Sequence, residues 1–78
     1  MPADKTLDAR DLVCPMPLLK TRQALRGLLP GETLLVLATD PGSCRDIPAY
    51  LGQSPHQLVQ QHEQQGEYQF LIAAGEES

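Results

Sequence analysis

The stretch Thr33–Thr39, which reads Thr-Leu-Leu-Val-Leu-Ala-Thr, constrains the fold of this chain most. It is apolar almost throughout and does not alternate between apolar and polar residues. Such a pattern is typical of a strand that is buried on both faces or that lies in the centre of a sheet. We therefore expect Thr33–Thr39 in the middle of a sheet that other segments complete.

A strand and a helix are predicted before this stretch. The short segment Lys5–Ala9 alternates in part and predicts a first strand. Pro15–Leu29 predicts a helix, because one face repeats at steps of three and four residues through Leu18, Thr21, Leu25 and Leu28. Leu29-Pro30-Gly31 should end this helix, since proline cannot continue it and glycine suits a turn.

A second helix is predicted after the loop Asp40-Pro41-Gly42-Ser43, running to about Leu51 or Gly52. Ser43 followed by Asp46 resembles a capping box, with Asp in the place where Glu is usual. Pro48 complicates this start, because it removes a hydrogen bond just past the first turn. The sequence leaves two alternatives open: a first turn of 3₁₀ type after Ser43, or a cap at Asp46.

The C-terminal part predicts a hairpin. His56–Glu63 reads as a weakly alternating strand and Glu67–Ala74 as a clearer one, joined by Gln64-Gln65-Gly66. Tyr68, Phe70 and Ile72 share one face of the last strand. The glutamines of the third strand are typical of a solvated strand at a sheet edge.

The resulting order β-α-β-α-β-β predicts one α/β domain over residues 1–78, ordered from about 5 to 74. The first two strands should be parallel through a right-handed crossover, and the last two antiparallel. Both helices then cover one face of a four-stranded mixed sheet, as a two-layer α/β sandwich. The loop that holds Cys14 and the loop Asp40–Arg45 should meet at the carboxyl edge of the parallel strands, where reaction sites of open α/β sheets gather.

Charge and hydropathy exclude several function classes. The formal net charge of −4 disfavours a nucleic-acid binder, which needs a basic stripe. All six basic residues lie in the first 45 positions, whereas the last 33 carry only acidic charges, so the surface is either polarised for docking a protein or simply solvated. No apolar run is long enough to span a bilayer, and the N-terminus lacks a signal-peptide pattern, so we expect a cytoplasmic protein without membrane contact.

The two cysteines, Cys14 and Cys44, are too few for a disulfide framework and fit a reducing compartment. Together with His56 and His62 they lack the short paired spacings of zinc sites. We therefore predict no metal and no cofactor.

The run Cys14-Pro15-Met16-Pro17 is the strongest candidate for chemistry. It places Cys14 at the N-cap of the first helix with Pro15 at the first helical position, where proline is favoured. Pro17 has no N–H, so the sulfur lacks one of the two backbone donors that usually bond to a capping side chain. Because the helix dipole favours negative charge at this end, we expect a lowered pKa for the Cys14 thiol.

The alternative is that Cys14 is a small buried hydrophobe at an ordinary helix start. Neither His56 nor His62 is placed beside Cys14 by the pattern. That disfavours a Cys-His hydrolase and favours a thiolate that acts by nucleophilicity alone, as in persulfide transfer.

The chain resembles the TusA/SirA-like (YedF-like) sulfur-carrier family over about Leu7 to Ala73. The resemblance is carried by Leu7–Arg10, Cys14–Lys20, Pro30–Glu32, Thr39–Gly42 with Arg45–Pro48, and Tyr68–Ile72. It implies the two-layer sandwich derived above. It also implies that Cys14 accepts sulfane sulfur as a persulfide from a cysteine desulfurase or another donor and relays it to an acceptor protein. Such a chain is a shuttle without an independent catalytic pocket.

The second loop has competing interpretations. Arg45 stabilises a sulfur anion and contacts a partner, or it pairs on the surface with Asp46, which caps the helix. Lys20 and Arg10, in segments that match the family, are further expected contacts for a partner or an anion. Cys44 is either a resolving thiol for Cys14 or a small residue at a helix start, and we favour the second.

Two other functions remain open from the sequence. The fold is shared with RNA-binding domains, so a non-catalytic protein- or RNA-binding module is possible, although the acidic balance disfavours RNA. A thiol redox regulator would use Cys14 and Cys44 and would form a reversible disulfide between them. The sequence does not distinguish tRNA thiolation, molybdenum-cofactor supply, selenium handling and sulfur oxidation as pathways.

Overall fold

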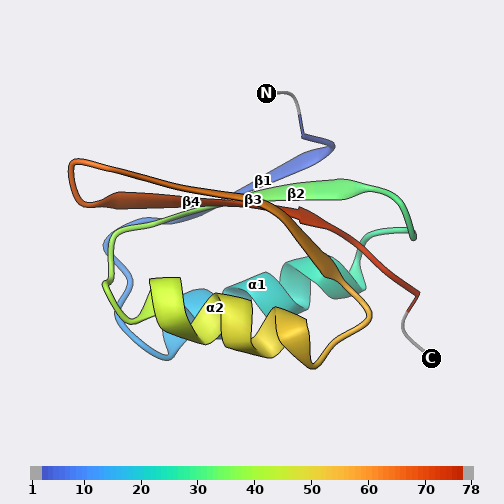
Figure 1. Ribbon diagram of the computed structural model, residues 1–78, viewed down its shortest axis with the longest axis horizontal. Helices are drawn as coiled ribbons and strands as arrows, with labels where there is room; N and C mark the ends of the chain where they lie inside the picture. Colours follow the sequence, from blue (N-terminus) through green and yellow to red (C-terminus); the bar gives the residue numbers. More distant parts are fainter. Residues whose placement is uncertain (1–2, 77–78) are drawn as a thin grey trace.

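The computed structural model describes residues 3–76 as a two-layer α/β sandwich. The elements follow in the order β1 (Lys5–Ala9), α1 (Met16–Arg26), β2 (Thr33–Ala38), α2 (Ser43–Gly52), β3 (Gln57–Gln64) and β4 (Glu67–Ala73). Both helices lie on one face of the sheet (Figure 1). The predicted fold class is therefore confirmed, whereas the extent of the ordered domain stays a prediction.

The sheet has four strands in the order β1-β2-β4-β3. β1 and β2 are parallel, and β4 runs antiparallel to both of its neighbours, β2 and β3. The central place predicted for β2 is confirmed. Of the two alternatives, the central place is the one found: Leu34, Val36 and Ala38 are fully buried, whereas Leu35 and Leu37, on the face away from the helices, are only partly covered.

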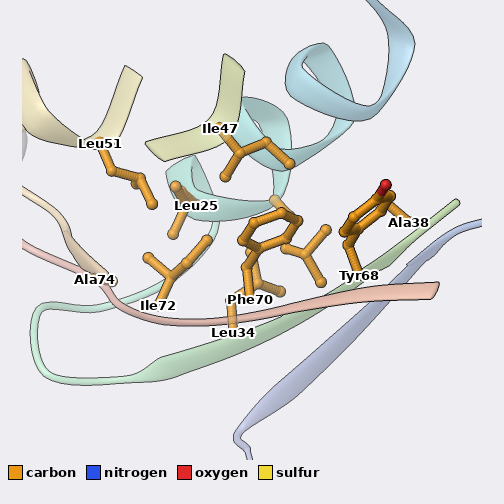
Figure 2. Close-up of a cluster of buried hydrophobic side chains, with 11 residues drawn as sticks. Leu25, Leu34, Ala38, Ile47, Leu51, Tyr68, Phe70, Ile72 and Ala74 are labelled. Carbon is orange, nitrogen blue, oxygen red and sulfur yellow. The ribbon is translucent and has the colours of Figure 1, made fainter. Parts of the chain in front are cut away.

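The core lies between the sheet and the helices. Phe70 and Ile72 of β4 are fully buried and face Leu25 of α1 and the α2 residues Ile47 and Leu51 (Figure 2). Tyr68 lies on the same face of β4, as its alternation predicted. These contacts fix both helices on the sheet and thereby fix the loops that precede them.

α1 ends earlier than the sequence indicated. The predicted end at Leu29 is wrong, because Gly27 already forms the C-cap and its N–H bonds to the Ala24 carbonyl three residues back. The Leu28 N–H likewise reaches the Leu25 carbonyl. These tighter bonds close the last turn before Pro30 is reached.

The predicted first turn of 3₁₀ type is found in the hydrogen bonds of α2, because the N–H groups of Cys44 and Arg45 reach the carbonyls of Pro41 and Gly42, three residues back. The caps predicted at Ser43 and at Asp46 are both wrong. The N-cap is Gly42, whose carbonyl accepts from the N–H groups of Arg45 and Asp46, and no side chain caps the helix. Helical backbone thus begins at Ser43, and Pro48 lies inside the helix. The Ser43 hydroxyl is buried and has no hydrogen-bond partner in the described part of the chain.

The hairpin between β3 and β4 turns through Gln65 and Gly66, whose φ angles are 53° and 82°. Positive φ at both central residues is the signature of the tight turn that matches strand twist. The predicted hairpin and the exposed, glutamine-rich edge strand are confirmed. Neither described helix has the length and apolar character needed to cross a bilayer.

Candidate functional site

Cys14 lies in the loop between β1 and α1, and its side chain is exposed. The predicted N-cap position is wrong: Pro15 is the N-cap, so Cys14 lies one residue before it. The reason is visible in the backbone. The Met16 N–H bonds to the Val13 carbonyl at 2.9 Å, which closes a turn around Cys14, and the Pro15 carbonyl accepts from Leu19 at 3.1 Å. The Cys14–Pro15 peptide is cis.

The Cys14 sulfur contacts an acidic side chain from the second helix. Its thiol donates a hydrogen bond to Oδ2 of Asp46, with Sγ and Oδ2 3.1 Å apart. Asp46 lies in the first turn of α2. Because α2 begins after β2 and the Cys14 loop follows β1, the two parallel strands bring these residues together at their carboxyl edge. The predicted meeting of the two loops is confirmed.

The hydrogen bond to Asp46 raises the pKa of the Cys14 thiol, and partial desolvation and the negative charges of Asp46 and Asp40 act in the same direction. The expected lowering of this pKa is therefore wrong for the free chain. A carboxylate in contact with the sulfur disfavours the thiolate. The Met16 N–H, which could have favoured the thiolate, bonds to the Val13 carbonyl instead.

Gly42 leaves room for the side chain of Asp40 and lies close to Cys14. A Cβ atom at position 42 would lie 3.7 Å from Cβ of Cys14 and 2.9 Å from Oδ2 of Asp40. The second distance is too short for a real Cβ, so any side chain here would displace Asp40. Oδ2 of Asp40 is buried and has no hydrogen-bond partner among residues 3–76.

The basic residues predicted near the site are placed differently. Arg45 is exposed, and within the described residues no hydrogen bond or ion pair joins it to Cys14 or Asp46. The interpretation that Asp46 caps α2 and pairs with Arg45 is thus wrong, because Asp46 binds the thiol instead. Lys20 is exposed on α1.

Arg10 is engaged by two carboxylates. Its Nε and Nη2 atoms donate to the two carboxylate oxygens of Asp8, each at 2.9 Å, and its Nη1 lies 3.6 Å from Glu67. The hydrogen bonds from Arg10 lower the pKa of Asp8 to about 2. An incoming anion at Arg10 would have to compete with both carboxylates.

Cys44 is not bonded to Cys14. It is half-buried in the first turn of α2, and its thiol donates to the Pro41 carbonyl at 3.0 Å. This contact is what a small residue at a helix start would make.

His56 is buried, and its Nδ1 accepts from the Gly75 N–H at 2.9 Å. In the described residues, no group of three or more acidic, His or Cys side chains is arranged to hold a metal ion.

Three exposed hydrophobic residues lie close to Cys14 in the sequence. Val13, Met16 and Leu19 are exposed by 68%, 38% and 40%, although they are large hydrophobic residues. Sequence reasoning identified the Cys-Pro-Met-Pro run but missed the exposure of these hydrophobic residues and the contact between Cys14 and Asp46. The position of Asp46 just after the second parallel strand was the signal that could have indicated it.

Comparisons with known proteins identify the family and the fold of this chain. The family described as "Sulfurtransferase TusA" matches residues 5–74. A protein of Pseudomonas fluorescens named "Sulfur carrier protein TusA" is 49% identical over 72 residues, which cover 92% of this chain and 87% of that protein. The crystal structure of a SirA-like protein from Desulfitobacterium hafniense superposes with a TM-score of 0.80 at 28% identity, covering 92% of this chain and 99% of that one. The chain belongs to the TusA sulfurtransferase family.

Proposed function

We propose that this protein is a sulfur carrier: Cys14 receives sulfane sulfur as a persulfide from a donor protein and passes it to an acceptor protein. The observation that carries the proposal is the exposed Cys14 sulfur at the carboxyl edge of β1 and β2, in a chain 49% identical to a relative named as a sulfur carrier. An exposed sulfur suits a shuttle, because the partner's sulfur must reach it directly.

The transfer is an exchange between sulfur atoms. Cys14 loses its proton, the resulting thiolate attacks the outer sulfur of the donor's persulfide, a new S–S bond forms, and the bond between the two donor sulfurs breaks. The electron pair leaves on the donor cysteine, which takes up a proton, as in thiol–disulfide exchange. The same step in the opposite direction, on an acceptor thiol, unloads Cys14. Neither step needs an oxidant.

The surface around Cys14 supports docking of a partner. Val13, Met16 and Leu19 lie within five residues of Cys14 in the sequence and are exposed, and exposed hydrophobic side chains mark interaction surfaces when they gather in one patch. Asp40 and Asp46 add negative charge at the sulfur itself. A donor site with apolar and cationic side chains would complement this surface. Arg45 and Lys20, exposed and free to extend, are proposed as further partner contacts.

Intact-mass measurement tests the proposal. The chain is incubated with a cysteine desulfurase and cysteine, and we expect it to gain the mass of one sulfur atom. The gain should disappear on treatment with a thiol reductant and in the Cys14→Ser variant, and it should persist in Cys44→Ser. A gain that survives Cys14→Ser contradicts the proposal. So does a chain that loses only the mass of two hydrogens, which indicates a disulfide between the two cysteines.

A further inference from the structure

The contact between Cys14 and Asp46 depends on the protonation state of the sulfur. The hydrogen bond of 3.1 Å between Sγ and Oδ2 has the thiol as its only donor, since an ionised carboxylate can only accept. A thiolate at the same place would face the carboxylate without a proton between them. The contact therefore exists in the thiol form and is lost when the sulfur ionises.

The charged groups that face Cys14 are all acidic. Asp46 contacts the sulfur from α2, and Asp40 acts on it from the loop between β2 and α2. The first turn of α1, which follows Cys14 directly, carries no acidic residue, and none of the described cations contributes to the environment of the sulfur. Among residues 3–76, no positive charge is among the groups that shift the pKa of Cys14 against the effect of the two carboxylates.

We propose, on the basis of the sulfur-carrier function, that Asp46 restrains the unloaded carrier by holding Cys14 as a hydrogen-bonded thiol, which protects it from alkylation and oxidation away from its partners. The thiolate is the nucleophile in sulfur exchange, so a thiol held by Asp46 reacts slowly with small electrophiles. A cationic group of a docked partner that takes up the charge of Asp46 removes the restraint.

Loading changes this contact. In the persulfide, Sγ is bonded to the second sulfur and carries no proton, so it no longer donates to Asp46. The terminal S–H of the persulfide is more acidic than the free thiol of Cys14, so the terminal sulfur bears a negative charge. The carboxylate of Asp46 repels this charge. The loaded sulfur is thereby directed away from α2. Asp46 thus acts in opposite ways on the two states: it holds the empty thiol and repels the loaded sulfur.

The rate at which iodoacetamide alkylates Cys14, followed by peptide mass from neutral to alkaline pH, tests this inference. Asp46→Asn keeps the size of the side chain and removes its charge. We expect several-fold faster alkylation of Cys14 near neutral pH and a rate profile displaced to lower pH. Asp46→Ser, also uncharged, should behave alike, which keeps the test available if one of the two variants folds poorly. Circular dichroism checks that each is folded.

Asp11→Asn is the matched control. Asp11 lies in the same loop as Cys14 and loses the same charge, but its side chain makes no contact with the sulfur in the described structure. Its profile should superimpose on that of the unmodified chain. Profiles of Asp46→Asn and Asp46→Ser that superimpose on the unmodified chain overturn the inference, and so does an equal displacement in Asp11→Asn. Alkylation needs no sulfur donor, so this outcome is independent of whether Cys14 gains sulfur in the mass measurement.

Discussion

Replacing Phe70 by Ala should remove a large share of the stability of this fold. Phe70 is fully buried on β4, where it pairs with the fully buried Val36 of β2 and faces both helices (Figure 2). Truncation of a buried Phe to Ala costs about 3–5 kcal/mol. A domain of this size has a free energy of unfolding of about 4–12 kcal/mol, from about 0.05–0.15 kcal/mol per residue. The variant should therefore lose about a quarter or more of its stability.

Urea unfolding followed by far-ultraviolet circular dichroism measures this loss. At about 4–8 °C per kcal/mol, the melting temperature should also fall by about 12 °C or more. Val59→Ala, at a side chain that is 52% exposed on the edge strand, is the control and should change stability by less than about 0.5 kcal/mol. Ile72→Val gives a graded value of about 0.5–1.5 kcal/mol if Phe70→Ala shows no folded baseline. A loss for Phe70→Ala no larger than that of Val59→Ala would refute the packing described here.

Three further predictions follow from local contacts. Arg10→Gln should raise the pKa of Asp8 from about 2 towards its ordinary value, measured by NMR titration of the carboxyl carbon, and an unchanged pKa would show that the ion pair is absent in solution. The raised pKa of Cys14 means that, as pH rises through the ordinary thiol pKa, the unfolded chain releases this proton before the folded chain does, so stability declines on the alkaline side. Urea midpoints of Cys14→Ser should show less of this decline than those of the unmodified chain, and parallel declines would contradict the contact with Asp46. Gln65→Asn should stabilise the hairpin by about 0.5 kcal/mol, because Asn tolerates positive φ at the first turn position, and a lower melting temperature would count against the turn type.

The architecture was predictable because local patterns determine it. Apolar periodicity located the four strands and two helices, and the short connection between β3 and β4 required a hairpin. The parallel pairing of β1 and β2 then brought the Cys14 loop and the Asp40–Arg45 loop to one edge. The helix ends were less predictable, since Gly27 and Gly42 end and start helices through backbone hydrogen bonds that leave no side-chain signature.

The sequence predicted the location of the candidate site correctly and the direction of the pKa shift of Cys14 wrongly. The Cys-Pro-Met-Pro run identified Cys14, but the cap position and the lowered pKa rested on the helix beginning one residue earlier than it does. The carboxylate that dominates the sulfur comes from 32 residues further along the chain. Only tertiary packing decides whether Asp46 caps its own helix or contacts the preceding loop, and a single sequence carries no measure of that choice.

The position of the transferred sulfur tests the central claim most directly. After incubation with a cysteine desulfurase and cysteine, persulfides are trapped with iodoacetamide, and the digested chain is analysed by peptide mass. The account predicts that the peptide containing Cys14 carries one extra sulfur between Sγ and the alkyl group, and that the peptide containing Cys44 carries the alkyl group alone. Extra sulfur on the Cys44 peptide, with none on the Cys14 peptide, would contradict it.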